Sequence, residues 1–186
     1  ELAVARGVVH RPAKVTEVRR AENGDIAALV TDRGEAIGGD IFVDCSGFHG
    51  LLIERTLGVP FASFKDNLFN DAAVVLPTEM VGRPPVETVA TALSNGWCWS
   101  IPLQHRFGNG YVYARDFQSP DAAEAELRRT LGVGDAVEAR HLTFRVGQVA
   151  RHWERNCVAV GLSQGFIEPL EATALHLVLG TVEQFI

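Results

Sequence analysis

Two kinds of connection between expected strands occur along this chain, and together they restrict the folds open to it. Residues 14–19 and 25–31 have the composition of strands, and Asn23-Gly24 between them is a hairpin turn signal. The apolar strand expected at 40–45 instead runs through a serine and a glycine into a helix expected at 51–57. Hairpins join antiparallel strands, whereas strand-to-helix units build parallel sheets. The sequence therefore predicts an α/β fold with helices and mixed sheets, part parallel and part antiparallel.

The remaining elements follow the same two patterns. We expect a helix that begins at Ser119-Pro120 and ends at Leu131. We expect further strands at residues 8–9, 72–76, 97–101, 110–115, 139–146 and 156–161. A last helix has one apolar face, formed by Leu175, Val178, Leu179, Val182 and Ile186.

Composition excludes several classes of protein. The 186 residues are 47% hydrophobic and 22% charged, which is ordinary for one globular domain. The net charge is -6 and the chain has two lysines, so we expect no nucleic-acid partner. The apolar runs are too short to span a membrane, and no signal peptide leads the chain. The chain opens without Met and closes inside a helix, so we expect an internal fragment of a longer protein.

The three cysteines stand singly in apolar stretches, as Cys45, Cys98 and Cys157. They have neither the spacing of a zinc site nor a CxxC pair. We therefore expect no metal, and three reduced, buried thiols in a cytoplasmic protein.

The stretch "GGDIFVDCSGFHGLL", residues 38–52, is the first candidate site. In doubly wound folds, ligands bind beyond the carboxyl ends of the strands. Gly47 and Gly50 would let the backbone approach such a ligand closely. An ordinary strand-turn-helix unit is the alternative.

The stretch "NGWCWSIPL", residues 95–103, is the second candidate. Trp97 and Trp99 are two positions apart, so on a strand they share one face. The pair is either an aromatic pair of the core or a flat wall beside a ligand cavity.

The third candidate is Glu168-Pro169-Leu170-Glu171, at the start of the last helix. Proline suits the first turn of a helix, and acids suit its positive end. The apolar neighbours allow a second interpretation, in which a carboxylate is tuned for acid–base chemistry. The backbone N–H groups near Thr173 could also hold an anion.

Three ordered motifs carry a family resemblance: "FVDCSGFHGLLIE", "GWCWSIPL" and "NCVAVGLSQGFIEPLEATALHL". Together they resemble the flavin-dependent halogenases, the tryptophan halogenase family. The most specific motif is Trp-x-Trp-x-Ile-Pro, at residues 97–102. The resemblance covers nearly the whole chain and is weakest over residues 1–31. It implies an FAD-binding fold like that of the flavin-dependent hydroxylases, incomplete at both ends. Residues 1–186 would be a fragment of one such domain, lacking the N-terminal GxGxxG fingerprint and the C-terminal part.

The resemblance also implies an activity. The enzyme would halogenate an electron-rich aromatic such as tryptophan or indole; a phenol or a pyrrole stays open. A separate flavin reductase, bound transiently, would supply reduced FAD. Oxygen and chloride or bromide would then give hypohalous acid, which a lysine delivers to the arene. Neither Lys14 nor Lys65 matches that lysine, so the fragment alone should be inactive. Assembly as a homodimer stays open.

The resemblance implies cofactor contacts in two loops and at one proline. Ser46 and Gly47 would lie where the strand turns toward FAD. The later FAD-contacting loop would include the residues Gly161, Leu162 and Gly165. Pro169 would pack near the flavin ring.

Further roles follow from the same resemblance. Thr173 and Ala174 would bind halide, although relatives often have Gly or Ser at the second position. Glu171 would orient the hypohalous species and help to accept the ring proton. Trp97 and Trp99 would separate the substrate from the flavin, so that the enzyme halogenates instead of hydroxylating.

Two alternatives stay open. One is a flavin-dependent aromatic monooxygenase, a hydroxylase on the same scaffold, against which the Trp-x-Trp pair argues. The other is a flavin-binding relative without catalytic activity.

Overall fold

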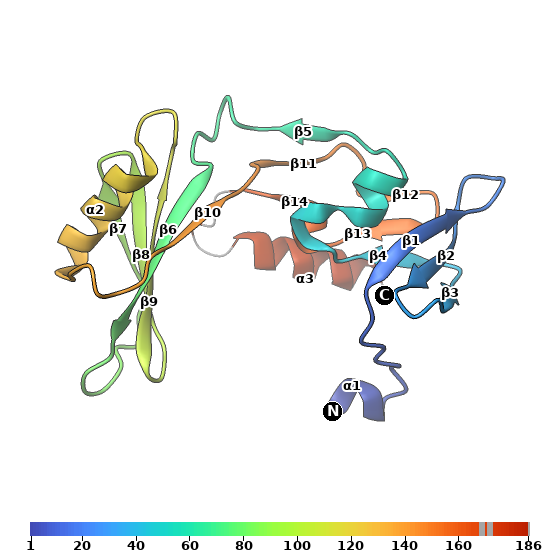
Figure 1. The fold of residues 1–186 in the computed structure, drawn as a ribbon, viewed down its shortest axis with the longest axis horizontal. Coiled ribbons are helices and arrows are strands. Elements are labelled where there is room, and N and C mark those ends of the chain that lie inside the picture. Colours follow the sequence, from blue (N-terminus) through green and yellow to red (C-terminus); the bar gives the residue numbers. More distant parts are fainter. Residues whose placement is uncertain (168–169, 171–172, 186) are drawn as a thin grey trace. The chain divides into compact units, whose positions relative to one another are not determined.

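The computed structural model describes residues 1–167, 170 and 173–185, and Figure 1 draws their fold. Within these residues the chain divides into two compact units. Unit 1 comprises Glu1–Phe61, Val149–Gly165 and Leu177–Ile186, and unit 2 comprises Ala62–Gln148 and Phe166–His176. That residues 1–186 belong to one domain stays a prediction.

Two small sheets build unit 1. The first is an antiparallel meander of β1 (Val15–Arg20), β2 (Ile26–Thr31) and β3 (Ala36–Gly38), in that order. The second has the order β12-β13-β4, from β12 (Trp153–Glu154), β13 (Cys157–Ala159) and β4 (Phe42–Asp44). β13 runs parallel to β4 and antiparallel to β12. The predicted hairpin after β1 and the mixture of parallel and antiparallel pairs are confirmed.

Short helical segments also belong to unit 1. They are α1 (Leu2–Ala5), η1 (Gly47–His49), the π-helix η2 (Leu51–Thr56) and η3 (Gly161–Ser163). Leu52 of η2 packs in one buried cluster with Phe42 and Cys157, whereas the next residue, Ile53, packs in another with Ala159. Consecutive residues of η2 are therefore anchored in two clusters, which hold this helix against the strands β4 and β13.

A side chain joins the meander to the second sheet of unit 1. Asn156 Nδ2 donates to the carbonyl of Ile26 at 2.9 Å, and its Oδ1 accepts from the N–H of Ile26 at 2.9 Å. The backbone carbonyl of Asn156 also accepts from the N–H of Phe42 at 2.8 Å. Asn156 thus supplies to β2 the pair of hydrogen bonds that a neighbouring strand would supply.

One five-stranded antiparallel sheet builds most of unit 2, in the order β10-β6-β9-β8-β7. Its strands are β6 (Ala72–Glu79), β7 (Val89–Leu93), β8 (Gly96–Pro102), β9 (Arg106–Tyr113) and β10 (Arg140–Thr143). The helix α2 (Pro120–Leu131) packs Ala123 and Leu127 against buried residues of one sheet face, among them Cys98 and Tyr111. The side chain of Ser119 accepts from the N–H of Ala122, which confirms the predicted helix start.

A third short sheet has the order β14-β11-β5, from β14 (Gly165–Phe166), β11 (Gly147–Val149) and β5 (Phe61–Ser63). It contains three of the places where the chain passes from one unit to the other.

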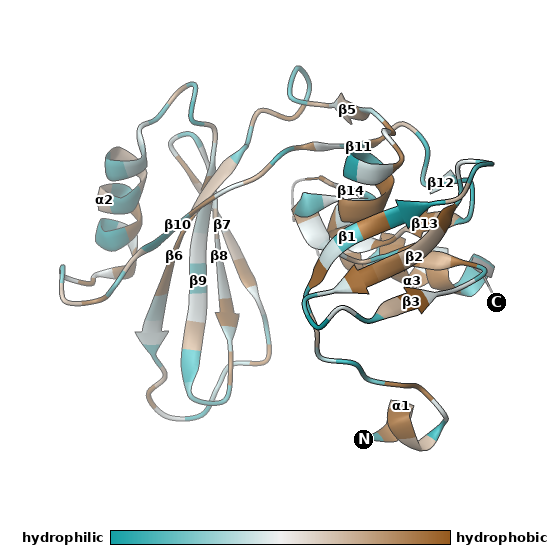
Figure 2. Cartoon of the chain, turned by 45° about the vertical axis from the view of Figure 1, so that its right-hand side comes forward, coloured by the Kyte–Doolittle hydropathy of each residue, from teal (hydrophilic) through white to brown (hydrophobic). Residues whose placement is uncertain are grey.

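The last helix is α3 (Thr173–Phe185), and Figure 2 shows that most of it is hydrophobic. Its predicted apolar face is largely exposed among the described residues: Leu175 is 67% and Leu179 is 61% exposed. Ile186, the last residue of that face, lies outside the described residues. Within the described residues, no helix is both long and apolar enough to cross a membrane.

Two sequence predictions are wrong. Residues 8–9 form no strand and are exposed, and the N–H of Val8 donates to the carbonyl of Ala3 at 3.0 Å at the end of α1. Cys45 is exposed, whereas Cys98 and Cys157 are buried as expected. The alternation of β4 explains the difference, since it turns Asp44 inward and the following residue outward.

A polar network ties α2 to the hairpin between β7 and β8. Glu126 Oε1 accepts from the N–H and the hydroxyl of Ser94, and its Oε2 accepts from the side chain of Gln118. The hydroxyl of Tyr111 donates to Gln118 at 2.8 Å and accepts from the N–H of Asn95 at 3.0 Å. Burial raises the pKa of Tyr111 to about 12, so the phenol stays protonated in this network.

The network predicts a dependence of stability on acid. Burial alone would raise the pKa of Glu126, but hydrogen bonds from Ser94 and Gln118 lower it from 4.5 to about 2. A carboxyl whose pKa is lower in the folded state stabilises the fold above pH 4.5, and that contribution is lost as the pH falls toward 2. We expect Glu126→Gln to lower the denaturant midpoint above pH 4.5, with the loss shrinking in acid. The exposed Glu138, replaced by Gln, is the control; an effect of Glu126→Gln that is equal at every pH would contradict the prediction.

Candidate functional site

Asp44, the last residue of β4, organises the first candidate stretch and is only 1% exposed. Its Oδ1 accepts from the N–H of Ser46 at 2.9 Å and from the Ser46 hydroxyl at 2.6 Å. Its Oδ2 accepts from the N–H groups of Leu52 at 2.8 Å and Ile53 at 2.9 Å. A buried carboxylate is stable only with such donors, so this side chain fixes both the turn and the start of η2.

Ser46 takes part in the same arrangement. Its Oγ donates to Asp44 and accepts from the N–H of Leu51 at 2.7 Å. The hydroxyl is therefore used to shape the turn, although the residue itself is exposed. A ligand at this turn would meet mainly the backbone.

The backbone of Asp44 holds the second candidate loop. Its carbonyl accepts from the N–H of Val160 at 3.0 Å and from the hydroxyl of Ser163. The η1 and η3 segments, far apart in the sequence, consequently lie side by side beyond the carboxyl ends of the parallel strands β4 and β13. One residue thus aligns two turns that the family resemblance assigns separately to a cofactor.

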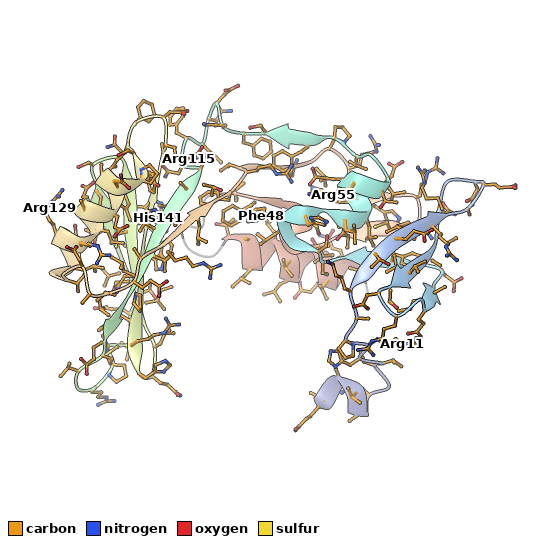
Figure 3. All side chains as sticks on the ribbon, in the orientation of Figure 1. Arg11, Phe48, Arg55, Arg115, Arg129 and His141 are labelled. Atoms are coloured by element: carbon orange, nitrogen blue, oxygen red, sulfur yellow. The ribbon has the colours of Figure 1, made fainter. Side chains whose placement is uncertain are left out.

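Both turns present open backbone. Gly47 has a φ of 70° and Gly161 a φ of 72°, a conformation that favours glycine. Among the described residues, a Cβ on Gly47 would meet no atom within 4 Å, and one on Gly161 would meet only Val178 Cγ2, at 3.9 Å. Phe48 on η1, labelled in Figure 3, and Leu162 on η3 are each 39% exposed. Open glycine backbone beside exposed apolar side chains fits a dinucleotide such as FAD at the strand ends.

Gly50 serves a different purpose from the one expected. It is buried, and a Cβ there would lie 2.7 Å from Glu54 Oε1. Its missing side chain makes room for Glu54 and gives no approach to a ligand.

The exposed Cys45 is not an activated thiol. Burial and the neighbouring Asp44 charge both raise its pKa. A thiol with a raised pKa carries less thiolate at neutral pH and is a weaker nucleophile.

Trp97 and Trp99 lie on the same face of β8, as expected. Cys98 between them is buried against α2, so both indoles lie on the opposite face of the sheet. Their ring centroids are 6.0 Å apart, the ring planes meet at 58°, and both residues are partly exposed. The pair is therefore not part of the core beneath α2, and it forms an aromatic surface on unit 2.

The remaining candidates are distributed as follows. Gly165 begins β14 and belongs to unit 1. Thr173 and Ala174 begin α3 and belong to unit 2, and the Thr173 hydroxyl donates to the carbonyl of Leu170 at 3.0 Å. The N-terminus of a 13-residue helix is a physically suitable place for an anion. Pro169 and Glu171 lie outside the described residues.

Sequence reasoning missed Asp44 as a site-forming residue. The signal was present, because an acid at the end of the apolar run "DIFVDC" must find hydrogen-bond donors once the strand is buried. The donors themselves come from residues up to nine positions away and could not be assigned from the pattern. In the described part of the chain, no three His, Cys, Asp or Glu side chains gather in a way that could hold a metal ion.

The chain belongs to the tryptophan halogenase family, because the model of that family, described as tryptophan halogenase, matches residues 1–186. The predicted fold is confirmed by structures of flavin-dependent halogenases. The tryptophan 6-halogenase SttH from Streptomyces toxytricini superposes with a TM-score of 0.94 at 45% identity, over 98% of this chain and 36% of its own. BrvH, a flavin-dependent halogenase from Brevundimonas sp. BAL3, superposes with a TM-score of 0.92 at 42% identity, over 98% and 38%.

Curated relatives agree with the structures. SttH is 48% identical over 185 residues, which cover 97% of this chain and 35% of SttH. The 7-chloro-L-tryptophan 6-halogenase KtzR from Kutzneria sp. (strain 744) is 48% identical over 188 residues, covering 99% of this chain and 36% of KtzR. The chain thus spans about a third of the length of these relatives.

Proposed function

We propose that the complete protein catalyses the FAD-dependent chlorination or bromination of an electron-rich aromatic. The observation that carries this proposal, beside family membership, is the Trp97–Trp99 pair on the face of the sheet of unit 2 that lies opposite α2. Two bulky indoles there suit a partition that keeps an arene away from the flavin. Relatives named as tryptophan 6- and 7-halogenases make tryptophan the first arene to test, followed by indole, phenols and pyrroles.

The cofactor would bind at the two turns that Asp44 aligns. Ser46, Gly47, Gly161, Leu162 and Gly165 would hold it mainly through backbone contacts. The family resemblance adds Pro169 beside the flavin. When bound and reduced, FAD would supply two electrons to oxygen, which takes two more from the halide, so that one oxygen atom ends in hypohalous acid and the other in water.

The chain's own residues would then guide the halogen. The first N–H groups of α3, at Thr173 and Ala174, would hold chloride or bromide, since a helix N-terminus attracts anions. Glu171 would orient the hypohalous acid and accept the proton that leaves the ring. Lys65 would not be the lysine that delivers the halogen, because its ammonium forms ion pairs with Asp71 at 3.2 Å and with Asp116 at 3.0 Å.

The partners and the compartment follow from the proposed reaction. A separate flavin reductase would supply reduced FAD through a transient encounter. A cytoplasmic location suits the cysteines, because all three are free thiols.

Product analysis tests the proposal. The complete protein is incubated with tryptophan, bromide, oxygen and reduced FAD from a flavin reductase, and products are identified by mass spectrometry. We expect a brominated arene that is absent when bromide is omitted. Oxygen insertion without bromination would instead favour the hydroxylase, and flavin binding without any product would favour a non-catalytic relative.

A further inference from the structure

Trp99 occupies a space that only glycine leaves open. In the pairing of β8 with β9, Trp99 lies opposite Gly110. A Cβ on Gly110 would lie 2.1 Å from Cζ2, 2.3 Å from Cη2 and 2.6 Å from Cε2 of the Trp99 indole. These three atoms belong to the six-membered ring of the indole. That ring therefore lies directly over the backbone of β9, where any other residue would place its side chain.

The backbone does not require glycine at this position. The φ of Gly110 is not in the left-handed region, in contrast with Gly47 and Gly161. The three atoms nearest to a Cβ on Gly110 all belong to the Trp99 ring, so this ring is the obstacle to a side chain there. At Gly96, by comparison, a Cβ would lie 1.9 Å from the backbone carbonyl oxygen of Val112, which cannot move without breaking the sheet.

A methyl group on Gly110 would consequently displace the indole and leave the strand in place. Trp99 is partly exposed, so its ring has room to rotate. Because the Trp97 ring is 6.0 Å away, such a rotation would change the geometry of the whole aromatic pair. On β7 the neighbour across from Trp99 is Ala90, whose small side chain offers little to hold the ring in its present orientation.

We propose that Gly110 is a positioning residue for the halogenation reaction: its missing side chain sets the orientation of the Trp99 indole and thereby the aromatic partition. This inference rests on the proposed function and deepens it. Gly110 touches neither arene nor cofactor in this proposal and acts only through Trp99.

The β9 strand offers a matched control. Gly108 lies on the same face two residues earlier, opposite Ile101 of β8. A Cβ there would meet Leu103 Cδ1 at 3.9 Å and the Ile101 carbonyl oxygen at 4.0 Å, both ordinary contacts. Gly108→Ala and Gly110→Ala both place alanine on the same face of β9, and of the two only Gly110→Ala brings its Cβ into the indole.

The first measurement needs no catalysis. Coupled indoles give a circular dichroism couplet whose sign and size depend on their mutual orientation, so the complete protein and both variants are compared in this band. We expect Gly110→Ala to reduce or reverse the couplet and Gly108→Ala to preserve it. A preserved couplet in Gly110→Ala, or the same change in Gly108→Ala, overturns the proposal whether or not the protein halogenates.

The second measurement concerns the reaction. A displacement of a reacting group by about 1 Å costs roughly a hundredfold in rate. We expect Gly110→Ala to lower the halogenated product formed per reduced flavin by about tenfold or more, with Gly108→Ala near the wild type. Should Gly110→Ala halogenate with the yield of the wild type, the proposal fails.

A third comparison applies if Gly110→Ala fails to fold. In a Trp99→Ala background no ring remains over β9, so Gly110→Ala should then change neither folding nor the remaining product yield. Destabilisation by Gly110→Ala that persists in that background would show a backbone requirement for glycine and would overturn the proposal.

Discussion

Replacing Asp44 by alanine is expected to lower the free energy of unfolding by about 4 kcal/mol, because several buried donors lose their acceptor at once. The N–H groups of Ser46, Leu52 and Ile53 all depend on this carboxylate. Asp44→Asn keeps the shape of the side chain, but its NH2 group cannot accept from one of the two pairs of donors. We therefore expect an intermediate loss in the free energy of unfolding. Denaturant unfolding of the complete protein measures both effects.

The exposed Asp40, just before β4, provides the control for Asp44. Asp40→Ala removes the same charge from the same segment and should leave the unfolding midpoint unchanged. If FAD binds at the two turns, Asp44→Asn should also weaken flavin binding, measured by the quenching of flavin fluorescence. A midpoint of Asp44→Ala equal to that of the wild type would refute the role assigned to the carboxylate.

Replacing Glu171 by glutamine is expected to lower the rate of halogenation by about a hundredfold, the usual contribution of a positioned acid–base group. The prediction rests on the family resemblance of the residues around Glu171 and on the proposed reaction. Single-turnover halogenation of tryptophan with an excess of reduced FAD measures the rate without the reductase limiting it.

Glu168→Gln is the matched control, because it removes a carboxylate three positions earlier in the same motif. We expect it to retain most of the activity, since that acid is assigned to the turn. Wild-type halogenation by Glu171→Gln would remove Glu171 from the proposed mechanism.

Much of the fold could be predicted because the helix caps, turn residues and apolar spacing in the sequence agree with the residues that the structure buries. For the helix α2, the sequence shows the capping serine and the first-turn proline, and Ala123 and Leu127 are spaced to face the core together. The strand β7 (Val89–Leu93) was missed, since its residues are exposed except for Leu93 and show no alternation. Its strand conformation comes from pairing with β8, which a local pattern does not contain.

The residues of the candidate site could be predicted from the sequence, but the packing contacts that hold them in place could not. The glycine turns and the tryptophan pair follow from spacing, and the family resemblance named their roles. That Gly50 is filled by Glu54, or that Gly110 lies under Trp99, depends on side-chain packing across turns and strands. Such contacts join residues by the register of the sheet, which the sequence alone does not specify.

Unit 1 is built from three separate segments of the chain, and this has a consequence for its folding during protein synthesis. β4 pairs with β13, and the carbonyl of Asp44 accepts hydrogen bonds from Val160 and Ser163, which follow much later in the chain. On the ribosome, all five strands of the sheet in unit 2 emerge before these partners exist. That antiparallel sheet, rich in neighbouring hairpins, can close early, whereas the parallel pair must wait for a distant segment. The side-by-side arrangement of the two proposed cofactor turns is therefore completed late, and a nascent chain that ends before β13 has the first turn without the second.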